Sequence, residues 1–112
     1  ISSMSAVRGM PKNLTTYAAT KAGVAHLAEG LRAELHGGPI KVTVLYPGYI
    51  ASEMNDRNPH PSPMLASTAK GVRAMVSAIE KEKDSACVPA LPWAPLGVVM
   101  RYAPMPLFKK LI

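Results

Sequence analysis

The sequence predicts an α/β fold, namely the C-terminal half of a doubly wound parallel sheet. Three observations support this prediction: a helical pattern over residues 14–36, a run rich in β-branched residues over 40–46, and a second helix and strand between 67 and 91. Helices that alternate with strands through short turns are typical of layered α/β domains. The 112 residues hold no pattern for the first half of such a sheet. We therefore expect one partial domain whose N-terminal half is absent.

The first helix is predicted over residues 14–36. Its apolar side chains recur at helical spacing and should form one stripe that faces the core: Val24, Leu27, Ala28, Leu31 and Leu35. Gly37, Gly38 and Pro39 should end this helix, because glycine tolerates the left-handed conformation and proline cannot continue a helix. The strand over residues 40–46 follows at once and is expected to be covered by helices on both faces.

The rest of the chain is predicted to form a loop, a helix, an edge strand and a terminal helix. Residues 49–65 contain three prolines and are interpreted as a substrate lid, with Met54 and Met64 as candidate contacts for an apolar substrate. The second helix begins at 67 or 68 and ends at 83, and its predicted inner face consists of Ala69, Val72, Met75, Val76 and Ile79. A strand over 86–91 is placed at the sheet edge by its proline. A short helix over 93–103 and a basic, apolar tail over 104–112 complete the chain.

Composition and charge exclude several classes of protein. An apolar share of 48% with 18% charged residues is typical of globular chains and excludes wholesale disorder. Cys87 is the single cysteine, so neither an internal disulfide nor a structural zinc site is expected, and a reducing, cytoplasmic setting is the default. The net charge is +6, but with 5% aromatic residues we predict no nucleic-acid partner. A weak contact between the tail and an anionic membrane stays open.

Tyr17 and Lys21 carry the clearest chemical signal. They lie four residues apart on the predicted helix, so both should point to one face, about 6 Å apart along the axis. A lysine ammonium at that distance favours the ionised tyrosine and makes its hydroxyl a usable proton donor and acceptor. The alternative is an ordinary surface pair, because this spacing is common on helices. The serines after Ile1 and the turn at Pro47 and Gly48 place further candidate ligand contacts at strand ends.

These residues, in this order and spacing, resemble the short-chain dehydrogenase/reductase family. The resemblance covers nearly the whole chain, from Ser2-Ser3 through Tyr17-x-x-x-Lys21 to Pro47-Gly48 and the residues that follow. It implies the C-terminal half of a Rossmann-type domain and a hydride transfer between a nicotinamide cofactor, NADP(H) or NAD(H), and a ketone or secondary alcohol. Tyr17 matches the general acid/base, Lys21 the lysine that holds the nicotinamide ribose, and Ser3 the serine that polarises the substrate.

The resemblance also implies further contacts and partners. The cofactor-binding residues that it assigns are Tyr17, Lys21, Pro47, Gly48, Ile50 and Ser52. Ser3 lies one residue farther from the tyrosine than is usual in the family, and Ser5 is the alternative. A homo-oligomer built through the first helix is implied as well. Because the glycine-rich phosphate turn is missing, the isolated chain is expected to bind dinucleotide poorly and to be inactive. A different class, a non-catalytic interaction or membrane-surface module, is the alternative function.

Overall fold

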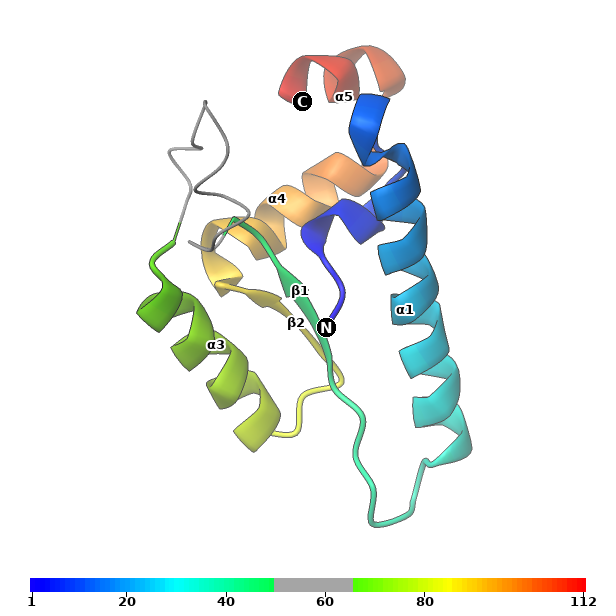
Figure 1. The fold of residues 1–112 in the computed structure, drawn as a ribbon, viewed down its shortest axis with the longest axis vertical. Helices are drawn as coiled ribbons and strands as arrows, with labels where there is room; N and C mark the ends of the chain where they lie inside the picture. The colour runs from blue at the N-terminus through cyan, green and yellow to red at the C-terminus, as the bar shows by residue number, and fades with distance from the viewer. Residues whose placement is uncertain (50–65) are drawn as a thin grey trace.

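The computed structural model describes residues 1–49 and 66–112, and within them the chain adopts a mixed helix and strand fold (Figure 1). The elements, labelled as in Figure 1, are the 3₁₀ turns η1 (Met4–Val7) and η2 (Lys12–Leu14), helix α1 (Thr15–Glu34), strand β1 (Val44–Pro47), helix α3 (Thr68–Glu80), strand β2 (Ser85–Val88), and helices α4 (Ala90–Tyr102) and α5 (Met105–Leu111). The α/β prediction, with a parallel sheet, is confirmed.

The sheet consists of β1 and β2, which pair in parallel with Val44 opposite Ser85 and Pro47 opposite Val88. Its strands are shorter than predicted. Residues 40–43 precede β1 and are not part of a strand, and β2 ends at Val88 because the next residue is a proline with no N–H to donate. The N-terminal residues form no strand, yet the Ser2 N–H donates to the Leu45 carbonyl at 2.8 Å and holds this segment beside β1.

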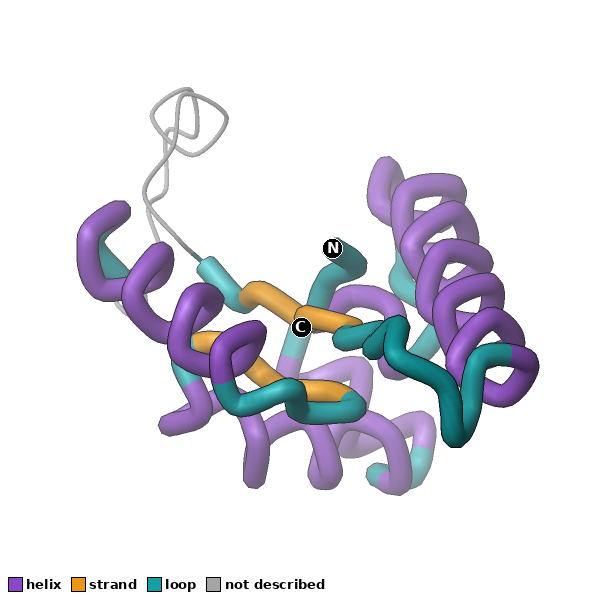
Figure 2. Tube along the Cα trace, turned by 90° about the horizontal axis from the view of Figure 1, so that it is seen from below, coloured by secondary structure: helices purple, strands orange, loops and turns teal. Residues whose placement is uncertain are grey.

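The helices surround the two strands. In Figure 1, α3 and α1 flank the strands on opposite sides, and Figure 2 shows the same separation from below. Both helices end earlier than predicted, α1 at Glu34 and α3 at Glu80. Helix α4 extends over almost the predicted range and has non-helical backbone at Leu91. In the part of the chain that the structure describes, no helix is long and apolar enough to cross a membrane.

The face that α3 buries differs from the predicted one. Leu45 and Val88 of the strands pack against Ala78, with Ala74 and Met75 at the side of this cluster. By contrast, three bulky residues predicted to face inward are about half exposed: Val72 at 48%, Val76 at 45% and Ile79 at 55%. Of the predicted inner face, Met75 alone packs against this cluster, whereas Ala69 is exposed with the three bulky residues.

Helix α1 repeats this pattern. Its buried residues are the alanines Ala18 and Ala25, whereas Leu27, predicted to be in the core, is 65% exposed. Val24 and Leu31 are exposed as well. The predicted apolar stripe of α1 is therefore wrong for these three leucine and valine positions among the described residues, and alanines make the inner contacts.

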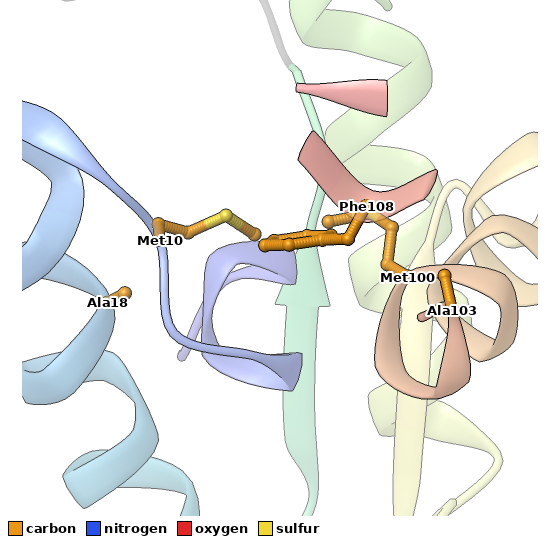
Figure 3. Packing of buried hydrophobic residues seen from close by; sticks show 5 residues of the cluster. All are labelled: Met10, Ala18, Met100, Ala103 and Phe108. Atoms are coloured by element: carbon orange, nitrogen blue, oxygen red, sulfur yellow. The ribbon is translucent and has the colours of Figure 1, made fainter. Parts of the chain in front are cut away.

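The tail predicted over residues 104–112 is a helix with one buried side chain. Phe108 of α5 is 3% exposed and belongs to a cluster with Met10, Ala18, Met100 and Ala103, which Figure 3 shows at close range. The cluster joins α5 and the end of α4 to the chain segment before α1. The basic pair Lys109 and Lys110 remains exposed.

Candidate functional site

Tyr17 and Lys21 lie together near the beginning of α1. The Lys21 ammonium nitrogen is 5.8 Å from the centroid of the Tyr17 ring, so the two side chains share one face as the spacing predicts. Tyr17 is 36% exposed and Lys21 is half-buried. A phenol that solvent can reach, with an ammonium beside it, is suited to proton transfer at an oxygen atom of a bound molecule.

Ser3 lies directly before η1 in extended backbone, with φ −163° and ψ 155°. Its hydroxyl oxygen accepts a hydrogen bond from the Ser5 N–H at 3.2 Å and lies 2.8 Å from the Ser5 hydroxyl. Ser3 therefore caps the 3₁₀ turn, which fixes its position. The two serines that sequence reasoning left as alternatives are in contact, so the structure brings both to one place.

Sequence reasoning counted Ser2 among the candidate ligand contacts and missed its structural role. Ser2 is buried, with 3% of its surface exposed, and its hydroxyl donates to the Lys21 carbonyl oxygen at 2.7 Å. Its N–H bonds to Leu45 of β1, so one residue links the strand to the helix turn that carries Lys21. A serine pair after an apolar residue was the available signal, but only the fold shows that the first serine is structural. The neighbouring Ser3 is held near the Lys21 turn as a consequence.

Pro47 ends β1, and Gly48 follows it at the carboxyl edge of the sheet. The Gly48 N–H donates to the Val88 carbonyl at 3.0 Å, which extends the ladder by one bond. The indole of Trp93 lies against Gly48 so closely that an added Cβ would be 2.0 Å from Cε2 of the ring. Glycine is thus required here by a side chain of α4, whatever else the turn contacts.

Trp93 is a residue that the sequence did not identify. It is 4% exposed, and its ring meets the Tyr49 ring edge to face, with centroids 5.5 Å apart. Its Nε1 atom is buried and has no hydrogen-bond partner among residues 1–49 and 66–112. The tryptophan therefore supports the turn after β1 through apolar contact. The predicted lid over 49–65, with Met54 and Met64, and the predicted contacts Ile50 and Ser52 lie outside the described residues, apart from Tyr49.

Ser3 follows Ser2, which bonds to Leu45 of β1, and Gly48 follows the last residue of β1. In Figure 1 the N-terminal segment and β1 run beside each other toward the same end of the molecule. Open α/β sheets bind ligands in the crevice outside the carboxyl ends of their strands. The first turns of α1, with Tyr17 and Lys21, begin at that same end. The candidate site is therefore this end of the sheet.

Two titratable groups of the strands have shifted pKa values. Burial raises the pKa of Tyr46 on β1 above its ordinary value, with a smaller contribution from the negative charge of Glu29, and burial raises the pKa of the Cys87 thiol. An open groove of about 460 Å³ lies where α1 ends, and its lining includes Arg32 and Asp84, whose side chains are 3.9 Å apart. This groove contains none of the predicted site residues, and no cluster of metal ligands occurs within the described ranges.

Comparisons with known proteins point to one family. Residues 1–62 match the model of the short chain dehydrogenase family. Over 104 residues the chain is 49% identical to an uncharacterized oxidoreductase of Mycobacterium tuberculosis, covering 93% of this chain and 41% of that protein. It is 34% identical over 111 residues to an uncharacterized oxidoreductase of Myxococcus xanthus, covering 96% of this chain and 42% of that protein.

A solved structure is similar over almost all of the chain. The crystal structure of a short chain dehydrogenase from Burkholderia cenocepacia, in complex with NADP, superposes with a TM-score of 0.76 at 27% identity. The match covers 99% of this chain and 46% of that one. The chain thus spans less than half the length of the relatives that it matches.

Proposed function

The chain belongs to the short-chain dehydrogenase family, and on this premise we propose that it forms the catalytic part of a nicotinamide-dependent oxidoreductase. The proposed reaction is a hydride transfer between NADP(H), or NAD(H), and a ketone or secondary alcohol. The observation that carries the proposal is the Tyr17–Lys21 pair, in which the tyrosine is accessible to solvent and the lysine turn is joined through Ser2 to the segment of Ser3 and to β1. NADP(H) is favoured because the similar protein from Burkholderia cenocepacia binds NADP.

In the reduction direction, the Tyr17 hydroxyl donates its proton to the substrate oxygen as that oxygen gains negative charge. The Lys21 ammonium, 5.8 Å from the tyrosine ring, stabilises the phenolate that this donation leaves. The Ser3 hydroxyl donates a hydrogen bond to the same substrate oxygen and orients the carbonyl. In the oxidation direction the proton returns from the alcohol to Tyr17.

The residues present fit the nicotinamide end of the cofactor, which supplies the hydride when it is bound. Lys21 offers three N–H donors, a chemistry that suits the two hydroxyls of a ribose. The backbone at Pro47 and Gly48 offers carbonyl groups at a strand end, and Trp93 keeps this turn rigid. The chain contains no G-x-G-x-x-G turn for the phosphates, so we assign only the ribose and nicotinamide contacts to it.

Tyr17→Phe in the whole protein tests the proposal. The change removes the proton donor and leaves the ring, so turnover of NADPH with a panel of ketones, for example acetophenone, 1-tetralone and cyclohexanone, should fall at least a thousandfold. Binding of NADPH, measured by nicotinamide fluorescence, should stay within about twofold. Tyr102→Phe is the matched control, because Tyr102 is 75% exposed on α4 and should keep full turnover. If Tyr17→Phe kept its turnover, the assignment of Tyr17 as the proton donor would be wrong.

A second candidate function, a membrane-surface or interaction module, is suggested by helix α5. Leu107 and Leu111 are 46% and 47% exposed beside Lys109 and Lys110, a pattern suited to an anionic lipid surface. Co-sedimentation of the whole protein with vesicles of phosphatidylcholine and phosphatidylglycerol tests it, with Leu107→Glu as the variant. Binding that Leu107→Glu does not reduce would reject this role for the helix. We also propose that the whole protein forms a homo-oligomer through α1, which is compatible with either function. Light scattering of the whole protein tests it.

A further inference from the structure

Arg8 connects the segment after Ser3 to the end of α4. It follows η1 directly and is half-buried. Its Nη1 donates to the carbonyl oxygen of Met100, at 3.1 Å, and to that of Ala103. Both carbonyls belong to the C-terminal end of α4, where helix carbonyls lack partners within the helix. The guanidinium therefore caps α4 with a positive charge at the negative end of its dipole.

The same guanidinium also contacts α5. Its Cζ lies 4.3 Å from the centroid of the Phe108 ring, which is within the range of a cation–π interaction. Phe108 is 3% exposed and packs with Met10 and Met100, as Figure 3 shows. A desolvated ring under a guanidinium that already holds two carbonyls leaves little freedom to either side chain. We call Arg8, Phe108 and the two α4 carbonyls the Arg8 clasp.

A reciprocal contact strengthens the clasp. Arg101 of α4 donates from Nη1 to the Val7 carbonyl at 3.3 Å, so each segment sends one arginine to the backbone of the other. Met4 of η1 packs against α4 too, because a Cβ at Gly97 would lie 2.8 Å from its methyl carbon. The segment after Ser3 is thereby fixed to residues that lie more than 90 positions away in sequence.

This segment also sets the position of Ser3 relative to Tyr17. Residues 4–16 join the two, and the far end of the segment is held by the Thr15 hydroxyl, which donates to the Met10 carbonyl at 3.0 Å. Met10 in turn packs against Ala18, the residue after Tyr17, and against Phe108. We propose, on the basis of the proposed function, that Arg8 is a positioning residue, which holds Ser3 at its working distance from Tyr17 by clasping the C-terminal helices.

The chemistry of the clasp calls for arginine. A planar guanidinium presents several N–H donors at fixed angles and stacks on an aromatic ring, whereas an ammonium is a compact point charge that does neither well. Methionine fills a similar volume but donates nothing. Because displacements of about 1 Å at reacting groups can lower rates about a hundredfold, loss of the clasp should act on kcat. The clasp does not include any of the residues proposed to hold the cofactor, so cofactor binding should not change.

The experiment compares Arg8→Met, Arg8→Lys and Phe108→Ala in the whole protein, with Arg73→Met as the matched control, because Arg73 is an exposed arginine of α3. Steady-state turnover of NADPH with the ketone panel, the Kd for NADPH and hydrogen exchange of residues 3–7 are measured on folded protein. Arg8→Met and Phe108→Ala should lower kcat ten- to a hundredfold, with the Kd for NADPH within twofold and faster exchange over 3–7. Arg8→Lys should recover part of kcat, and Arg73→Met should match the wild type.

The outcomes separate this inference from the proposed function. A kcat for folded Arg8→Met equal to that of the wild type, with only a lower melting temperature, would mean that the clasp is structural and would overturn the inference. Unchanged hydrogen exchange over residues 3–7 in this variant would overturn it as well. A wild-type protein that neither binds NADPH nor reduces a ketone would instead refute the proposed function, and with it the catalytic meaning of the clasp. Lower kcat with faster exchange and unchanged NADPH binding supports the inference.

Discussion

Replacing Gly48 with alanine should destabilise the protein, because Trp93 occupies the space that a Cβ needs. The added carbon would lie 2.0 Å from Cε2, 2.2 Å from Nε1 and 2.5 Å from Cδ2 of the indole. Carbon atoms in ordinary contact are about 3.5–4.0 Å apart, so the ring would have to retreat by about 1.5 Å. Trp93 is 4% exposed and has no space to do so. Overpacking of a well-packed core costs about 1–3 kcal/mol, and three clashing ring atoms argue for the upper end.

Urea unfolding of the ligand-free whole protein, followed by circular dichroism, measures this loss. Gly9→Ala is the matched control, because a Cβ at Gly9 meets no atom within 4 Å, and it should change the free energy of unfolding by less than about 0.5 kcal/mol. In a Trp93→Leu background most of the Gly48→Ala penalty should disappear, since contacting residues are not additive. If Gly48→Ala proved as harmless as Gly9→Ala, the close approach of the indole would be wrong.

Two further predictions concern Ser2 and the groups whose pKa is raised. Ser2→Ala removes the buried hydrogen bond to the Lys21 carbonyl and should lower the free energy of unfolding by about 1 kcal/mol in urea, whereas an unchanged value would mean that this bond stabilises nothing. Burial raises the pKa of Cys87 and of Tyr46, so the folded state holds these protons more tightly than the unfolded state. Stability should therefore decrease as the pH rises above the ordinary thiol value of 9.0, and Cys87→Ala should weaken this decrease in a pH series of thermal melts.

The sequence predicted the order and type of α1, β1, α3, β2 and α4, but it missed helix α5, placed a strand end at the N-terminus where no strand forms, and misjudged which helix faces are buried. Periodicity marks a stripe of bulky residues, and on α3 that stripe, Val72 and Val76 among it, faces away from the strands. The helix meets the sheet through Ala74 and Ala78, which periodicity treats as weak signals. A stripe of large apolar residues does not have to coincide with the face through which a helix contacts a sheet. In the described residues the sheet has two strands, and the large apolar residues of α3 find no partner there. The buried face is decided by which side chains let the backbones approach.

The candidate site was predictable where its geometry is local. Tyr17 and Lys21 lie one helical turn apart, so the helix period alone brings them together, and the structure has them in contact range. Ser2, Trp93 and Arg8 were not predictable, because each acts through a residue distant in the sequence. No single-sequence pattern marks a serine that bonds to a carbonyl nineteen positions away. Their roles follow from the fold alone.

The positions of the motif residues depend on supporting residues outside the motif. Ser2 ties the Ser3 segment to α1, Trp93 holds the turn at Gly48, and Arg8 ties the same Ser3 segment to α4 and α5. Ser3, Lys21 and Gly48 are thus supported by contacts that cross to another element, and two of the three supporting contacts involve the last quarter of the chain. Because Arg8 ties the Ser3 segment to α4 and α5, substitutions near the C-terminus should alter catalysis even when no motif residue is replaced.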